Sequence, residues 1–292
     1  MSQRQACRVV KQPRSTQRYQ RKDGPRQAEE ARLRKHLHEL ARAHPRYGYR
    51  RVTVLLQREG WRINRKRVRR LLREEGLKVP RSRRVKRQLK GASESSIVHA
   101  PAQHANDVWA WDFAKSFDER GRPLRWLSII DEYTRELIVI HVSRSITSEV
   151  AIEALHQAIR ERGLPCRVRS DNGPEFIAQA LGRYVTSAEI GTLYIAPASP
   201  WENGYVESYH SKLRDELLNM EVIENVKHAQ SVAQRWKQSY NEFRPHSSLG
   251  NQTPREYADS LREAAQEVPE GAGCPSPPNP SRKTKGRVSK PA

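Results

Sequence analysis

A succession of three apolar runs, followed by alternating helical and strand-like patterns, constrains the fold of this chain most strongly. The predicted strands are residues 107–115, 124–131, 135–142, 166–170 and 192–195. The predicted helices are residues 145–161, 176–187 and 225–240, with a further helix beginning near residue 204. The polar turn at 118–122 is typical of a hairpin between the first two strands. Strands that first follow one another and then alternate with helices predict an α/β layered sheet.

Three carboxylates occupy distinctive positions in this pattern. Asp112 lies inside the first strand, Asp171 directly follows the fourth strand, and Glu207 lies near the start of a helix. The spacing alone proves little, because Asp23 and Glu59 have the same separation as Asp171 and Glu207. Carboxylates on a strand, at a strand end and on a facing helix can share divalent cations. Two such ions can serve phosphoryl transfer, so we interpret the three residues as a candidate active site.

The positive charge is concentrated in the first third of the chain. Residues 1–90 hold 30 Lys or Arg against 7 Asp or Glu, whereas residues 91–292 hold 24 against 26. This asymmetry predicts a nucleic-acid-binding segment joined to a near-neutral domain. The alternative is a basic region that serves only solubility.

A helix-turn-helix pattern lies within the basic segment. Leu33, Leu37 and Leu40 form a helical stripe, and two short amphipathic helices follow, separated by Gly60 and the predicted N-cap Asn64. The second short helix carries the cations that we predict to contact DNA, which are Arg65, Lys66, Arg67, Arg69, Arg70 and Arg73. Some of these would reach bases and others phosphates. The alternative is a three-helix bundle with a solvated basic face.

Composition divides the chain into five segments. In order, they are a flexible basic arm (1–27), a helix-turn-helix domain (28–80), a basic linker (81–103), a catalytic core (104–258) and a disordered Pro- and Lys-rich tail (259–292). No apolar run approaches the ~20 residues of a membrane span. Three widely spaced cysteines predict no disulfide framework, so we expect a cytoplasmic protein.

Several strings, in order, resemble one protein family. They are HPRYGYRRVTVLLQREG (44–60), WAWDF (109–113), IIDEYTRE (129–136), RSDNGPEF (169–176), SPWENGYVES (199–208), KLRDELLN (212–219) and YNEFRPHSSLGNQTP (240–254). The set resembles the second-reading-frame (OrfB) transposases of the IS-three group of bacterial insertion sequences. These belong to the DDE integrase superfamily. The resemblance implies a ribonuclease-H-like integrase core, a five-stranded mixed sheet with flanking helices, preceded by an all-α helix-turn-helix region.

The resemblance also implies roles for single residues. Asp112, Asp171 and Glu207 would be the catalytic triad that binds two Mg²⁺ ions, with Mn²⁺ as a substitute. Lys212 and Arg214, on the helix of Glu207, would contact DNA near the reacting end. The closing motif, with Tyr240, Arg244, Pro245 and His246, would be either structural or DNA-facing. One departure is Ala114, where many relatives carry Thr; the position is not a metal ligand.

The expected function is therefore DNA cleavage and strand transfer at insertion-sequence ends. The expected partners are double-stranded DNA (element ends and target), further copies of this chain, and possibly the first-reading-frame protein, with no membrane. The expected location is the bacterial cytoplasm, at the nucleoid. Two alternatives are a DNA-binding regulator without catalysis and a simple Mg²⁺-dependent nuclease.

Five neighbouring residues receive more modest interpretations. Asp131 ends a strand, but the pattern favours a role in the turn rather than in metal binding. Glu175 and Glu202 are expected to be surface groups or to lie behind the triad. We expect one ring of the pair Trp109 and Trp111 to pack in the core and the other to face a partner or DNA.

Overall fold

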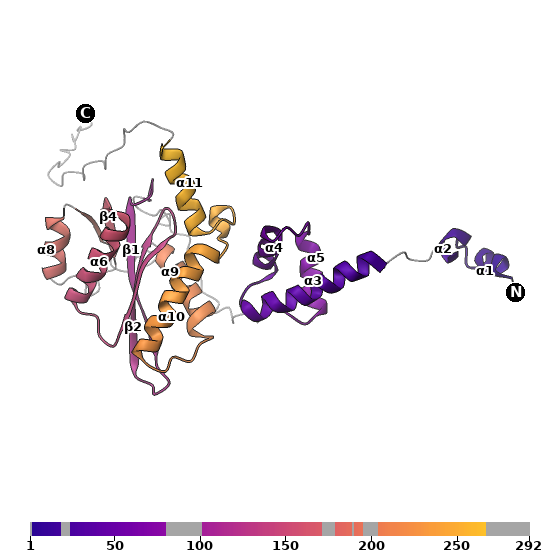
Figure 1. The fold of residues 1–292 in the computed structure, drawn as a ribbon, viewed down its shortest axis with the longest axis horizontal. Helices are drawn as coiled ribbons and strands as arrows, with labels where there is room; N and C mark the ends of the chain where they lie inside the picture. The colour runs from indigo at the N-terminus through magenta and orange to yellow at the C-terminus, as the bar shows by residue number, and fades with distance from the viewer. Residues whose placement is uncertain are drawn as a thin grey trace, which may run out of the picture. The chain divides into compact units, whose positions relative to one another are not determined.

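The chain forms two compact units, residues 1–82 and 83–292 (Figure 1). The computed structural model describes residues 2–18, 24–79, 101–170, 179–188, 190–194 and 204–266. Within these ranges, no helix is long and apolar enough to cross a membrane.

The first unit contains a cluster of three helices, α3 (Gly24–Ala43), α4 (Tyr49–Arg58) and α5 (Arg65–Glu74). The predicted stripes form its core, with Leu33, Leu37 and Leu56 fully buried beside Val68 and Leu71. The predicted N-cap of α5 is confirmed. The side chain of Asn64 accepts a hydrogen bond from the backbone N–H of Lys66, and Gly76 follows the helix with φ of 71°.

Residues before this cluster include helix that we did not expect. The segment predicted as a flexible arm contains α1 (Gln3–Val9) and α2 (Arg14–Arg18), and α3 begins at Gly24 rather than near residue 28. A capping box starts α1, because the side chain of Ser2 accepts from the N–H of Gln5 and the Gln5 side chain accepts from the N–H of Ser2. Ser-x-x-Gln was therefore the overlooked signal.

The second unit is built on a five-stranded mixed sheet in the order β3-β2-β1-β4-β5. The strands are β1 (Val108–Phe117), β2 (Pro123–Asp131), β3 (Leu137–Ser143), β4 (Arg167–Ser170) and β5 (Gly191–Tyr194). The first three form an antiparallel meander, and β4 pairs in parallel with both β1 and β5. The predicted mixed sheet is thus confirmed, with strand boundaries shifted by one or two residues.

Helices cover both faces of the sheet (Figure 1). One face packs against α6 (Ser148–Arg162) and α8 (Gln179–Ser187), and the other against α9 (Gly204–Leu213) and α10 (Val226–Gln238). Trp109 and Trp111 are both buried on the α6 face. Our expectation of opposite orientations was wrong, because residues two apart on a strand point to the same side.

The edge strand β3 is covered by side chains from the α10 region. In the π-helical turn η3 (Ser239–Phe243), the buried Asn241 accepts from the backbone N–H of Leu137 and donates to its carbonyl, both at 2.9 Å. Farther along the strand, the amide of Gln230 donates to the carbonyl of Val142 at 3.2 Å. These bonds occupy backbone groups that an edge strand would otherwise leave unpaired.

The chain continues as helix beyond the predicted end of the core. The short turns η2 (Arg214–Leu218) and η4 (Ser247–Leu249) precede α11 (Pro254–Gln266), which extends into the segment predicted to be disordered from residue 259. A capping box begins α11, because Thr253 and Glu256 exchange side-chain-to-backbone bonds of 2.7 and 3.1 Å.

The cysteine expectation also needs a correction. Cys7 is buried and free, but Cys166 is disulfide-bonded. Sequence separation does not limit which cysteines a fold brings together, so wide spacing was a poor argument against pairing.

We predict that Asn241→Leu destabilises the second unit. Leucine has the same branched arrangement of side-chain heavy atoms but leaves the N–H and C=O of Leu137 without partners, at about 1–3 kcal/mol for each unsatisfied group. Urea unfolding of the full chain measures the effect. Asn219→Leu, at an exposed position, is the matched control and should unfold like wild type. Equal stability of the two variants would contradict the role of Asn241.

The β1–β2 hairpin generates a prediction about pH. Asp118 accepts bonds from the backbone and side chain of Arg122 at 2.8 and 2.9 Å and from Arg144 at 2.6 Å. Burial alone would raise the pKa of Asp118, but these bonds outweigh it and hold the pKa far below its usual value.

A lowered pKa in the folded state means that the stabilisation is present above the unfolded pKa of about 3.9 and is lost as the pH falls below it. Melting temperatures of wild type and Asp118→Asn should therefore converge between about pH 4 and pH 2. A constant difference across this window would contradict the prediction.

Candidate functional site

Asp112 lies in the middle of β1, on the face of the sheet that α9 covers. It shares this face with Ala110 and Ala114, which are fully buried against α9 and α10. Its cross-strand neighbour is Ser128, which is also buried. The carboxylate of Asp112 is partly accessible, with 21% of the side chain exposed, so it can still receive a ligand.

Glu207 lies in the first turn of α9. The side chains that dock this helix on the sheet are Val206, Tyr209 and Leu213, all buried. The hydroxyl of Ser128 donates to that of Tyr209 at 3.4 Å, so α9 is bonded to the strand residue that faces Asp112. Glu207 adjoins this docked face and is half-buried.

A histidine that the sequence analysis missed connects α9 to Asp112. Nδ1 of His210 lies 3.0 Å from Oδ2 of Asp112, and 7% of the histidine side chain is exposed. His210 lies three residues after Glu207, so the two share a helical face. The first turns of α9 therefore pack against the part of β1 that contains Asp112. The available signal was the i, i+3 spacing of Glu207 and His210 on one predicted helix.

The third predicted carboxylate, Asp171, lies outside the described residues, as do Glu175 and Glu202. The strand before Asp171 is described, and its register pairs Arg169 with Ala110, two residues before Asp112. Arg169 also forms a buried ion pair of 2.9 Å with Glu132, in the turn after β2. Burial raises the pKa of Glu132 to about 7, partly offset by Arg169.

The two cations predicted near the reacting end follow Glu207 along the chain. Lys212 is half-buried and its ammonium donates to Ser208 at 3.1 Å, one turn earlier on α9. Arg214 is exposed and begins η2. Glu207, His210 and Arg214 follow one another at intervals of three and four residues, which places them along one side of the helix.

Asp131 has a structural role, as predicted. Its Oδ1 accepts from the backbone N–H groups of Tyr133 and Thr134 at 2.7 and 3.0 Å, and its Oδ2 accepts from Asn106 at 2.7 Å. Burial raises its pKa, although these three bonds oppose the rise. The carboxylate thus closes the turn between β2 and β3.

The described part of the closing motif is structural. Arg244 is 1% exposed and donates two bonds, of 2.8 and 2.7 Å, to the carboxylate of Glu216 in η2. Its guanidinium lies 5.8 Å from the ring of Tyr240, and the ring of His246 packs edge-on against the same tyrosine. The motif therefore ties the chain after α10 to the chain after α9.

The cations of α5 divide into two groups. Arg67 pairs with Glu30 of α3 at 3.2 Å, and Arg70 lies 3.7 Å from both Glu30 and Glu74. Arg34 of α3 holds Glu74 at 2.7 Å. These ion pairs fix one side of α5 against α3.

The remaining cations of α5 are exposed. Arg65, Arg69 and Arg73 recur every four residues and so form one stripe, with Lys66 beside it. The guanidinium of Arg69 lies 5.6 Å from the ring centre of Tyr49, at the start of α4. This stripe is available to a polyanion, although the side chain of Arg70 is also exposed.

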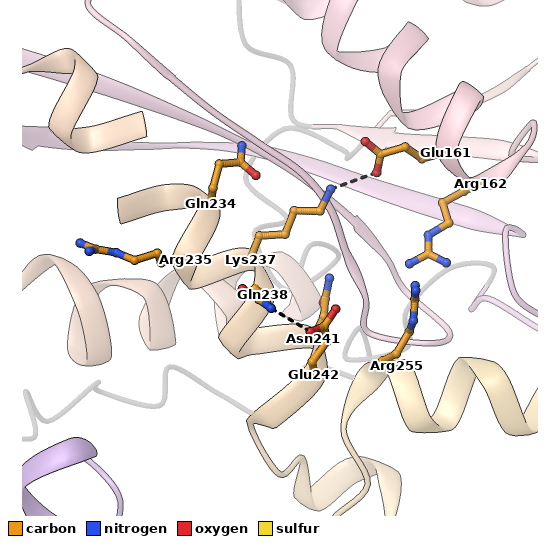
Figure 2. Close-up of a pocket in the computed structure, with 9 residues that line it drawn as sticks. All are labelled: Glu161, Arg162, Gln234, Arg235, Lys237, Gln238, Asn241, Glu242 and Arg255. Carbon is orange, nitrogen blue, oxygen red and sulfur yellow. Dashed lines mark hydrogen bonds and ion pairs between the residues drawn. The ribbon is translucent and has the colours of Figure 1, made fainter. Parts of the chain in front are cut away.

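A polar cleft of about 450 Å³ lies elsewhere on the catalytic unit. Figure 2 shows Lys237 of α10 reaching toward Glu161 of α6, a contact of 3.0 Å, and Arg162 and Arg255 facing one another. Arg162 and Arg255 both pair with the buried Glu136. The cleft contains neither Asp112 nor Glu207, and its ion pairs join helices from the two faces of the sheet.

Family models match both units of the chain. A model described as integrase core domain matches residues 102–200, and a second of the same description matches 188–254. A model described as HTH-like domain matches residues 27–86. Together these matches cover the carboxylates and the basic helices.

Curated relatives come from insertion elements. The uncharacterized protein of insertion element IS407 from Burkholderia multivorans is 38% identical over 91% of this chain and 93% of its own length. The protein of IS476 from Xanthomonas euvesicatoria is 36% identical over 90% and 74%. Transposase InsD of Escherichia coli, for element IS2D, is 26% identical over 76% of each chain.

A solved structure, the HTLV-2 integrase catalytic core domain in complex with magnesium, matches 54% of this chain and 99% of that chain, with 19% identity and a TM-score of 0.41. Likeness at that level adds nothing to the assignment, which rests on the family models and the insertion-element relatives. The chain belongs to the integrase-core transposases of bacterial insertion sequences, the family that its motifs resemble.

Proposed function

We propose that this transposase uses water to hydrolyse the phosphodiester at each end of its element. In the same active site the freed 3′-OH then attacks a second phosphodiester, forming a new P–O bond as the P–O bond to the neighbouring 3′ oxygen breaks. The observation that carries the proposal is the contact between His210 of α9 and Asp112 of β1. It brings the helix turn of Glu207 over the strand of Asp112, as a shared cation site requires. Asp171 directly follows β4, the strand beside Asp112.

The donor atoms suit a hard divalent ion. We propose Asp112, Asp171 and Glu207 as the ligands of two Mg²⁺ ions, because carboxylate oxygens are the ligands that Mg²⁺ prefers, and Mn²⁺ should substitute. When bound, the ions supply activation of the attacking oxygen and stabilisation of the leaving oxygen. One oxygen of Asp112 accepts from the N–H of Phe113 at 2.7 Å, which restrains the carboxylate while leaving lone pairs for coordination.

The remaining contributions come from positioning and charge. Lys212 of α9 and Arg214, the first residue of η2, follow Glu207 along the chain and would contact the phosphates next to the reacting bond. The protein needs no covalent nucleophile, since in-line displacement requires only that the attacking oxygen be held in place. By likeness to the IS-three group, the first attack joins the two element ends on one strand, and the resulting circle integrates later.

The helix-turn-helix unit would supply binding to double-stranded element ends. We propose that the exposed stripe of α5, namely Arg65, Arg69 and Arg73, meets the DNA, while Arg67 and Arg70 hold α5 on α3. Joining two ends requires at least two copies of the chain on DNA. A first-reading-frame protein remains a proposed additional partner.

We predict that Asp112→Asn, Asp171→Asn and Glu207→Gln each lower strand transfer by at least about 10³-fold, because a metal ion contributes several kcal/mol to such a transition state. The assay uses labelled terminal sequences of the element with Mg²⁺ and scores joined DNA ends. DNA affinity, measured by fluorescence anisotropy, should be unchanged. The control Glu221→Gln alters an exposed carboxylate outside the site and should remain active.

The products separate the proposal from its alternatives. Joined ends from wild type alone support the transposase. Nicks without joining, even after the first-reading-frame protein is added, would point to a nuclease. Salt-dependent binding without any product would point to a regulator. Full strand transfer by Asp171→Asn would refute the assignment of the triad.

We predict different effects for two arginines of α5. Arg69→Ala should weaken binding to element ends and reduce the slope of log affinity against log salt by about one, because one phosphate contact is lost. Arg67→Ala should leave that slope unchanged and lower thermal stability slightly, since exposed ion pairs contribute about 0–1 kcal/mol. Equal changes in salt slope would contradict the division of α5 into two sides.

A further inference from the structure

His210 is a buried polar residue. Among the described residues, its one polar contact is with Asp112, the proposed metal ligand. The residue is 5% exposed, and Nδ1 lies 3.0 Å from Oδ2 of Asp112. Its other ring nitrogen, Nε2, is buried and has no hydrogen-bond partner among the described residues. The aromatic ring of Tyr209 lies beside it, with 5.4 Å between ring centres.

Packing alone does not account for a histidine at this position. The neighbouring docked positions of α9 are apolar or aromatic, namely Val206, Tyr209 and Leu213. An aliphatic side chain at position 210 would fill the same layer without burying an unsatisfied nitrogen, which costs on the order of 1–3 kcal/mol. The histidine therefore supplies something that packing does not, and the polar contact available to it is with Asp112.

The two oxygens of Asp112 are restrained from different directions. Oδ1 accepts from the backbone N–H of Phe113, on the same strand, and Oδ2 faces Nδ1 of His210, on the helix. A carboxylate is an acceptor only, so Nδ1 must carry the proton in this contact. Groups from the strand and from the helix thus contact the two oxygens of Asp112 and restrain the rotation of the carboxylate about its Cβ–Cγ bond.

We infer that His210 is a positioning residue that orients Asp112 for metal binding and sets the distance between β1 and the helix turn of Glu207. The inference rests on the proposed function, because it gives Asp112 the role of a ligand. The ion itself would contact Asp112, and His210 would act through it. Groups that orient metal ligands typically change metal affinity or activity 10–100-fold when they are removed.

Side-chain geometry provides a sharp test. The amide nitrogen of asparagine is attached to Cγ, as Nδ1 of histidine is, so His210→Asn can present an N–H at the same place. The amide nitrogen of glutamine is one atom farther out, at the level of Nε2, and His210→Leu presents no donor. The inference therefore predicts that Asn substitutes for His while Gln and Leu do not.

The experiment measures Mn²⁺ binding to the full-length protein by calorimetry, without DNA. We expect His210→Leu and His210→Gln to bind Mn²⁺ about 10–100-fold more weakly and His210→Asn to bind within about threefold of wild type. The Mg²⁺ concentration for half-maximal strand transfer should shift in the same order. Melting temperature without metal should not follow this order, since Leu packs at least as well as His.

Two results would overturn the inference. One is wild-type Mn²⁺ affinity in His210→Leu, and the other is an equal loss in the Asn and Leu variants, which would mean that the donor at Nδ1 is irrelevant. Asp112→Asn separates this failure from that of the proposed function. If Asp112→Asn also binds Mn²⁺ like wild type, the ligand assignment fails. If it loses Mn²⁺ while His210→Leu does not, only the positioning role fails.

Discussion

The close packing of α9 on β1 is the contact on which the catalytic unit depends. Ala110 and Ala114 flank Asp112 on one face of the strand, and both are fully buried. Their small side chains let Val206 and Tyr209 reach the sheet, so the carboxylate stays near the helix instead of under a layer of larger residues. Ala114, the one visible departure from the family pattern, thus lies directly under the docked helix.

Polar groups buried around this contact hold the surrounding chain in place. Arg244 and Glu216 join the segments that follow α10 and α9, and Asp131 closes the turn between β2 and β3. Buried polar groups are costly unless satisfied, so each of these contacts admits few alternative arrangements. Many residues of the motif strings recognised in the sequence, such as Arg244, Glu216 and Asp131, form these buried contacts. The strings therefore identify the family through its folding requirements as well as through its catalytic residues.

Periodicity predicted the sheet and the three-helix cluster because buried apolar stripes repeat along one element. It identified Leu33 and Leu37 as core residues, and it assigned Asp112 to a strand and Glu207 to a helix, as the structure has them. It missed His210, because the contact that distinguishes this residue is with Asp112, on a strand almost a hundred residues earlier in the sequence. It also assigned six cations of α5 one role, because sequence does not reveal that Glu30 of α3 neutralises one side of the helix. The two unexpected helix starts followed local capping signals that apolar periodicity does not register.

The side chains along β3 have a consequence for assembly. Asn241 and Gln230 occupy backbone groups at the two ends of this outer strand. A strand whose outer backbone groups are engaged at both ends offers a shorter template for pairing with a strand of another molecule. Copies that gather on a pair of DNA ends would then meet through helices and loops at this edge, rather than by joining their sheets into one. Such contacts can form and separate without breaking backbone ladders.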